Sequence, residues 1–134
     1  MVVLDASVAV RWFVSQPGHE AAVAWLRRSI DNPSLLIVPD LFHFEVYGAL
    51  CRLQRSEGAG WVERCLSRLA RLGLRTVPST KVDVMRGAAL SRDLMLGGYD
   101  ALYLAHAERL GVRWLTADVR ALRRLAGDPR VLAL

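Results

Sequence analysis

Short apolar runs alternate along the chain with longer amphipathic segments. The apolar runs are too short for helices and rich in β-branched residues, as expected of strands that are buried on both faces of a parallel sheet. Together with the short segments 75–78 and 112–115, they predict strands over residues 2–4, 35–38, 75–78, 112–115 and 131–134. The segments between them place apolar residues on one helical face and predict helices over residues 8–14, 20–29, 40–55, 61–72, 81–94, 99–110 and 118–125.

Strands that alternate with helices predict an α/β fold. We expect three layers, with helices on both faces of a central, mostly parallel sheet of four to five short strands. Right-handed crossovers should join its parallel strands. The 134 residues contain no repeat, low-complexity tract or linker, so the sequence predicts a single domain over residues 1–134.

The composition is rich in apolar residues for a small soluble protein. The hydrophobic fraction is 53%, and we expect part of it to form a surface for another chain. No secretory signal opens the chain, because Asp5 and Arg11 interrupt the apolar start, and no stretch approaches the ~20 apolar residues of a membrane span. Cys51 and Cys65 match neither a disulfide scaffold nor a zinc site. We therefore expect buried free thiols and a cytoplasmic protein.

The net charge of +5 is unevenly distributed. Residues 1–67 carry six basic and seven acidic side chains, whereas residues 68–134 carry twelve and six. Every basic residue except Lys81 is an arginine, the side chain best suited to bidentate contacts with phosphate. A basic half is compatible with nucleic-acid binding, although solvated helix faces produce the same pattern.

Asp5 directly follows the first predicted strand. A carboxylate at the point where a central strand ends and a helix begins lies in the crevice where open α/β folds bind ligands. The alternative is that Asp5 only caps the next helix.

Glu45 lies in the middle of a predicted helix and on its apolar face. The positions three and four residues away are Leu41, Phe42, Gly48 and Ala49. An unpaired buried carboxylate costs several kcal/mol, so Glu45 requires a cation, hydrogen-bond donors or an exposed cleft. The alternative is a buried ion pair with an arginine.

Two further acids occupy comparable positions. Asp100 opens the predicted helix 99–110 and shares a face with Leu104 and Ala107, although an acid at this end also interacts favourably with the helix dipole. Asp118 follows the strand 112–115, where helix capping alone would also account for it.

In one α/β sheet these four carboxylates can converge on a single crevice. Close carboxylates repel one another, so either their pKa values rise or a cation neutralises them. A set of oxygen ligands without histidine or cysteine suits Mg²⁺ or Mn²⁺ better than zinc. The chemistry expected of such a site is metal-assisted hydrolysis of a phosphodiester.

Four motifs resemble those of PIN-domain proteins, and their size and order resemble VapC-type toxins of bacterial type II toxin–antitoxin modules. In chain order they are Val-Val-Leu-Asp-Ala-Ser at 2–7, Phe-Glu-Val at 44–46, Tyr-Asp-Ala-Leu-Tyr-Leu-Ala at 99–105 and Leu-Thr-Ala-Asp at 115–118. Each motif is weak alone, but four in this order and spacing are fairly specific.

The resemblance implies a Mg²⁺-dependent endoribonuclease of PIN-like fold, with Mn²⁺ as a second possible ion. It implies that Asp5, Glu45, Asp100 and Asp118 bind the metal and carry the catalysis. It also implies supporting roles for the hydroxyls of Ser7 and Thr116. Its implied partners are RNA, a small antitoxin that lies across apolar helices, and a second copy of the chain.

Two other functions remain open at this stage. A phosphoacceptor signalling domain would use Asp5 and Thr116, but it also needs a late lysine, and the only lysine is Lys81. A protein that binds RNA without cleaving it would account equally well for the basic second half.

Several residues are set aside for simpler explanations. We expect the histidines at the surface, the tryptophans in the core or an interface, and Arg11 on a solvated helix. These residues are His19, His43, His106, Trp12, Trp25, Trp61 and Arg11.

Overall fold

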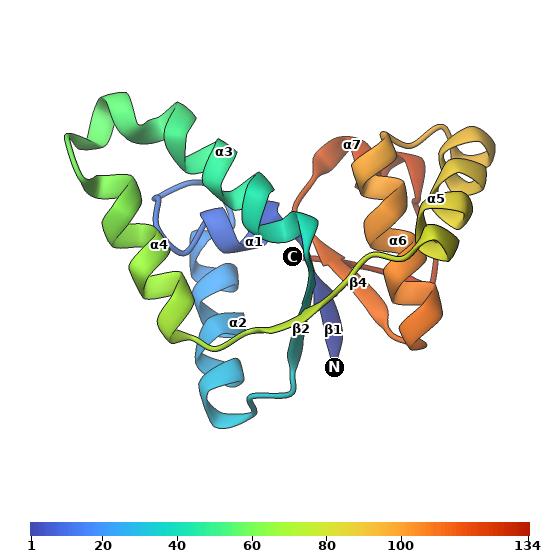
Figure 1. Ribbon diagram of the computed structural model, residues 1–134, viewed down its shortest axis with the longest axis horizontal. Coiled ribbons are helices and arrows are strands. Elements are labelled where there is room, and N and C mark those ends of the chain that lie inside the picture. The colour runs from blue at the N-terminus through green and yellow to red at the C-terminus, as the bar shows by residue number, and fades with distance from the viewer.

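The computed structural model describes residues 1–134 and contains five strands and seven helices, with one or two helices between successive strands (Figure 1). The strands are β1 (Val2–Leu4), β2 (Leu36–Pro39), β3 (Arg75–Val77), β4 (Arg113–Thr116) and β5 (Val131–Ala133). The helices are α1 (Ala6–Val10), α2 (His19–Asp31), α3 (Leu41–Glu57), α4 (Trp61–Arg71), α5 (Lys81–Leu94), α6 (Gly98–Leu110) and α7 (Val119–Arg124).

The strands form one sheet in the order β3-β2-β1-β4-β5, and every neighbouring pair is parallel. Helices α1 to α4 lie on one side of the sheet, and α5 and α6 lie on the other (Figure 1). The predicted three-layer α/β architecture is therefore confirmed. From β1 the sheet grows through β2 to β3 in one direction and through β4 to β5 in the other, so the order reverses between β1 and β4.

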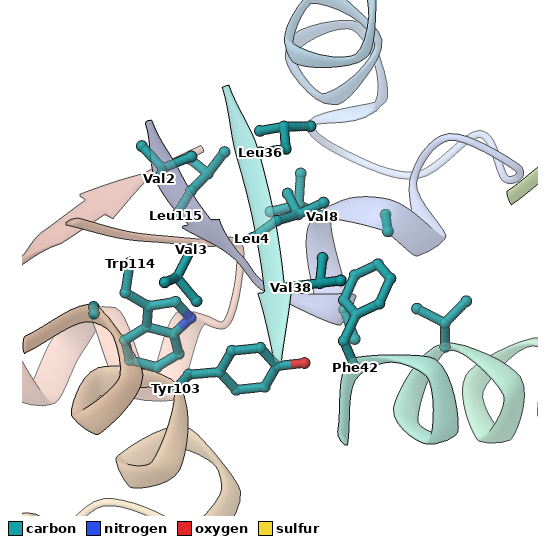
Figure 2. Packing of buried hydrophobic residues seen from close by; sticks show 14 of the residues in the cluster. Val2, Val3, Leu4, Val8, Leu36, Val38, Phe42, Tyr103, Trp114 and Leu115 are labelled. Atoms are coloured by element: carbon teal, nitrogen blue, oxygen red, sulfur yellow. The ribbon is translucent and has the colours of Figure 1, made fainter. Parts of the chain in front are cut away.

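The central strands are apolar because both of their faces are covered. Val3 of β1 pairs with Ile37 of β2 and with Trp114 of β4, and all three side chains are fully or almost fully buried. Figure 2 shows the core residues of β1, β2 and β4 packed against Phe42 of α3 and Tyr103 of α6. Burial of one such side chain contributes about 1.5–3 kcal/mol to stability. The packing of this core therefore stabilises the sheet even though its strands are short.

The first helix differs from its prediction. It spans Ala6–Val10 rather than 8–14, because the Asp5 carboxylate accepts the Ser7 N–H at 2.7 Å and starts the helix earlier. Arg11 is half-buried, not solvated, and its guanidinium donates to the carbonyls of Ser7 at 2.6 Å and Pro17 at 2.8 Å. These two bonds hold the loop that leads to α2.

His106 is buried, so the prediction of a surface histidine is wrong at this position. Its Nδ1 accepts from Arg109 at 3.1 Å, which leaves Nε2 to donate to the Ser79 hydroxyl at 2.9 Å. The Ser79 hydroxyl in turn donates to the Asp40 carboxylate at 2.5 Å. This chain of bonds joins α6, the end of β3 and the start of α3, which is a connection between distant residues that no local pattern reveals.

The other side chains that were set aside divide between core and surface. Cys65 is buried as predicted, whereas Cys51 on α3 is exposed, and both thiols are free. The three tryptophans, Trp12, Trp25 and Trp61, are partly buried against the core, as predicted. No helix combines the length and the apolar character needed to cross a membrane.

Asp83 is a buried acid with a clear structural role. It closes a capping box with Thr80 at the start of α5, and its Oδ1 accepts from Arg109 Nε at 2.6 Å. Its side chain is 1% exposed. Although burial opposes the charged form, the bonds from Arg109 and Thr80 lower the pKa of Asp83 from 3.8 to about 2.

We expect Asp83→Asn to reduce the free energy of unfolding at pH 7 by roughly 2 kcal/mol, which is the value of this pKa difference. Because the pKa is lowered in the folded state, the stabilisation is present above pH 3.8 and is lost as the pH falls toward 2. Urea unfolding at pH 7 and pH 3 measures both effects. Asp93→Asn is the matched control, since Asp93 pairs with Arg92 in the solvent. Equal effects of the two substitutions would contradict the prediction.

Candidate active site

The site lies where the strand order reverses. Asp5 follows β1, and Asp118 follows the neighbouring strand β4 after a single intervening residue. In an open α/β sheet this reversal opens a crevice at the carboxyl ends of the two strands. The Asp5 N–H donates to the Leu115 carbonyl at 3.0 Å, so β1 and β4 remain paired up to the edge of the crevice.

The hydroxyls of Ser7 and Thr116 join the two strand ends. Ser7 Oγ accepts the Ala117 N–H at 3.0 Å, and Thr116 Oγ1 accepts the Asp118 N–H at 3.0 Å. Both hydroxyls also favour the charged form of Asp5 and oppose the rise in its pKa. They therefore fix the backbone that carries the two aspartates.

All four predicted acids line one pocket of about 390 Å³. Helix α3 contributes Glu45, the first turn of α6 contributes Asp100, and the strand ends contribute Asp5 and Asp118. The pocket thus gathers carboxylates from four separate stretches of the chain, as their expected convergence requires.

Asp5 is buried against the core. Its Oδ1 accepts from Ser7 N–H at 2.7 Å, and its Oδ2 accepts from the indole N–H of Trp114 at 2.9 Å. Burial nevertheless raises the pKa of Asp5, because desolvation outweighs these bonds. Asp5 does cap α1, as the alternative interpretation expected, but the same carboxylate also lines the pocket.

Glu45 is half-buried on the apolar face of α3, and no arginine pairs with it. The buried-ion-pair alternative is therefore excluded. Its Oε2 is buried and makes no hydrogen bond. Burial and the charge of Asp5 raise the pKa of Glu45. The nearby Tyr103 hydroxyl opposes that rise, although no hydrogen bond of ordinary geometry joins the two residues.

Asp100 is the acid whose pKa responds to the charges of all three others. Burial, followed by the charges of Asp118, Asp5 and Glu45, raises the pKa of Asp100 to about 7. Asp118 caps α7, where its Oδ1 accepts from Ala121 N–H at 2.8 Å, and its Oδ2 makes no bond within the protein. The four carboxylates thus line one pocket, and none of them forms an ion pair with an arginine.

The donor set fits a hard divalent cation. No group of three or more His, Cys, Asp or Glu residues is gathered closely enough to hold a metal as it stands. However, Glu45 Oε2 is buried without a partner, and the pKa of the Asp100 carboxyl lies near 7, so these two acids have no cation paired with them. Carboxylate oxygens are the ligands that Mg²⁺ and Mn²⁺ prefer.

Some residues of the site could not be identified from the sequence. Trp114 lies in a predicted strand, and nothing in an apolar run indicates that its N–H meets Asp5. Arg52 lines the pocket from α3, and its position seven residues after Glu45, two helical turns along the same face, is the signal that could have found it. No histidine lines the pocket, as expected.

Comparison with known proteins agrees with this geometry. No curated protein matches the chain by sequence. Among solved structures, a toxin–antitoxin complex from Klebsiella pneumoniae aligns with a TM-score of 0.71 at 17% identity, over 98% of this chain and 96% of that one. PAE2754 from Pyrobaculum aerophilum aligns with a TM-score of 0.72 at 21% identity, over 98% of this chain and 87% of that one.

At these identities the two structures establish a shared fold only. The family is established by sequence instead. The model of the PIN domain matches residues 2–128, which include all four acids of the pocket, and the chain therefore belongs to the PIN domain family.

Proposed function

We propose that this protein is a Mg²⁺-dependent endoribonuclease and the toxin of a toxin–antitoxin pair. PIN domains are generally nucleases, and they generally use divalent metal ions. The observation that carries the proposal is the convergence of Asp5, Glu45, Asp100 and Asp118 in one pocket without a paired cation. We assign the metal-binding and catalytic roles to these four side chains, with Mn²⁺ as a second possible ion.

The residues of the pocket have separate tasks in this proposal. Ser7 and Trp114 hold the Asp5 carboxylate in one orientation, and Thr116 fixes the backbone before Asp118. A bound Mg²⁺ would supply a water of lowered pKa and stabilise charge on the leaving oxygen. Without a cation the pKa of Asp100 is raised to about 7, so metal binding near neutral pH would displace a proton from this carboxyl group.

Arginines beside the pocket support a nucleic-acid substrate. Arg120, Arg123 and Arg124 share one face of α7 and line a cavity of about 570 Å³. Asp100 and Asp118 line both this cavity and the acidic pocket. None of the three arginines forms an ion pair, so their charges are available to phosphates on either side of the scissile bond.

Exposed apolar side chains on α5 support protein partners. Val82, Val84 and Met85 are 72%, 55% and 72% exposed. Beside them, α5 and α6 enclose a mostly apolar groove of about 690 Å³. We propose that these helices bind a second copy of the chain and that a small antitoxin covers the remaining apolar surface, in a reducing cytoplasm that suits two free thiols.

The purified protein is expected to cleave single-stranded RNA in Mg²⁺ or Mn²⁺ and to lose this activity in excess chelator. Asp100→Asn is expected to lower the cleavage rate at least ~100-fold, because one charge of the metal site is lost. Asp93→Asn, which alters an exposed acid on α5, is the control. Gel analysis of labelled RNA measures both. Cleavage that persists in chelator would contradict the proposal, and RNA binding with neither cleavage nor a cation requirement would favour a passive RNA-binding protein.

The pH dependence should follow Asp100. Because its pKa is raised to about 7, the carboxylate that binds metal predominates only above that pH, so cleavage at low Mg²⁺ should rise between pH 6 and pH 8. A cation favours the ionised form, so higher Mg²⁺ should move this rise to lower pH. Initial rates at two Mg²⁺ concentrations test this, and a midpoint that is independent of Mg²⁺ would be the opposite result.

The wild-type protein is expected to be a dimer in solution. Val84→Asp should convert it to a monomer, because a carboxylate on α5 would be desolvated in the interface. Val119→Asp is a matched control, since Val119 on α7 is 56% exposed compared with 55% for Val84. Light scattering coupled to size exclusion gives both masses. A monomeric wild type, or equal effects of the two substitutions, would remove α5 as the dimer surface.

A further inference from the structure

Tyr103 places a hydroxyl behind the acidic pocket. It lies on α6, one turn after Asp100, and only 1% of its surface is exposed. Its ring packs in the core parallel to Trp114, with 6.0 Å between the ring centroids and 8° between the planes. Figure 2 shows the hydroxyl pointing away from Trp114, past the end of β2, toward the start of the helix that carries Glu45.

The Tyr103 hydroxyl has no hydrogen-bond partner. It and Glu45 Oε2 are the only buried side-chain nitrogen or oxygen atoms in the protein without one. A buried polar group left unbonded costs about 1–3 kcal/mol, so two such groups in one place are unfavourable for the fold alone. One is a donor and the other is an acceptor, and they are close enough that each shifts the pKa of the other: burial, the charge of Asp5 and then Glu45 raise the pKa of Tyr103, and Tyr103 opposes the rise in the pKa of Glu45.

The neighbouring aromatic residue already performs this kind of task. Trp114 donates its indole N–H to Asp5 Oδ2 at 2.9 Å from the core side of the pocket. The stacked rings of Trp114 and Tyr103 therefore lie on the core side of the acids. The indole N–H of Trp114 is directed at Asp5, and the hydroxyl of Tyr103 lies near Glu45. The bond from Trp114 is made in the structure, whereas the Tyr103 hydroxyl and Glu45 Oε2 are both left without a partner.

We propose that Tyr103 is a positioning residue whose hydroxyl donates to Glu45 when that carboxylate turns to hold a divalent cation. This inference rests on the proposed metal-dependent function. The bond would fix the Glu45 side chain as Trp114 fixes Asp5. Groups that orient a metal ligand in this way typically change metal affinity by 10–100-fold when they are removed.

Tyr103→Phe separates this role from packing. The phenylalanine keeps the ring against Trp114 and removes only the oxygen, which makes no bond in the metal-free fold. The metal-free variant should therefore have an unfolding temperature equal to or higher than that of the wild type. Its affinity for Mn²⁺ should nevertheless fall at least ~10-fold.

The experiment titrates Mn²⁺ alone into wild type, Tyr103→Phe and Tyr47→Phe, with free Mn²⁺ measured by electron paramagnetic resonance. Tyr47 is the control, because it lies on the same helix as Glu45 but is 53% exposed. Thermal unfolding in EDTA gives the metal-free stability. Weaker Mn²⁺ binding without loss of stability, confined to Tyr103→Phe, is the expected result.

Glu45→Gln tests the partner of the hydroxyl. If Tyr103 acts through Glu45, the substitution Tyr103→Phe should have little further effect on Mn²⁺ affinity in the Glu45→Gln background. Additive losses would overturn the contact. Unchanged Mn²⁺ affinity, or a lowered metal-free unfolding temperature with no change in affinity, would show that the hydroxyl is purely structural and would overturn the positioning role.

The outcomes also separate this inference from the proposed function. A wild type that binds Mn²⁺ and is weakened by Tyr103→Phe but does not cleave RNA would retain the positioning role and lose the endoribonuclease. A wild type that cleaves RNA while Tyr103→Phe binds Mn²⁺ normally would retain only the endoribonuclease. A wild type that binds no Mn²⁺ would overturn both.

Discussion

Parallel pairing between β1 and β4 brings together two strand ends from opposite ends of the chain. The pairing extends from Val2 and Arg113 to Leu4 and Leu115, and it places Asp5 beside the turn that contains Asp118. Since the chain leaves these strands in different directions, no helix covers their carboxyl ends. Helices α3 and α6 reach the opening from the two faces of the sheet and add Glu45 and Asp100. Every contact of the pocket depends on this one register.

The acids of this protein fall into two groups, which differ in whether an arginine pairs with them and in the direction of their pKa shift. Asp83, Asp93, Glu108 and Asp128 each form an ion pair with an arginine, and the pKa of each is lowered. The pocket acids form none, and the pKa values of Asp5, Glu45 and Asp100 are raised. The buried pair of Asp83 and Arg109 stabilises the fold, the exposed pair of Asp93 and Arg92 contributes little, and the unpaired acids reduce its stability. The core of β1, β2 and β4 offsets that reduction, which is the usual compromise at a functional site.

Much of the fold could be predicted from the sequence because its signals are local. Uninterrupted apolar runs marked β1 and β2, and the alternation of short strands with helical segments indicated a parallel sheet. The first helix was misplaced because its start is set by the Asp5 side chain rather than by hydrophobic periodicity. His106 was misplaced for a similar reason. Its partners Ser79 and Arg109 satisfy a buried imidazole, and Ser79 is far away in the sequence.

The pocket itself could be predicted only in part. Glu45 was identifiable because a carboxylate on an apolar helix face conflicts with its surroundings, and Asp5 because it ends a buried strand. Trp114 and Tyr103 are ordinary apolar residues in their own segments. Their polar atoms acquire a meaning only when β4 and α6 are assembled next to the acids. The sequence pattern identifies a residue whose polarity conflicts with its neighbours, such as Glu45. It does not identify a residue such as Trp114 that fits an apolar segment and also donates a hydrogen bond to the pocket.

A metal-dependent nuclease has to attract a cation and a polyanion to the same place. Four carboxylates attract a divalent ion and the three arginines of α7 attract phosphate, while Arg11 and Arg52 add positive charge to the lining of the acidic pocket itself. Here the two surfaces adjoin without merging. Asp100 and Asp118 line both cavities, yet the arginines of α7 do not lower the pKa of Asp100, which responds to the other acids instead. Because the two cavities share Asp100 and Asp118, the arginines of α7 begin at the edge of the acidic pocket. If the protein is the metal-dependent ribonuclease proposed above, an RNA strand that crosses from one surface to the other would place its flanking phosphates beside the arginines and the phosphate between them beside the acids.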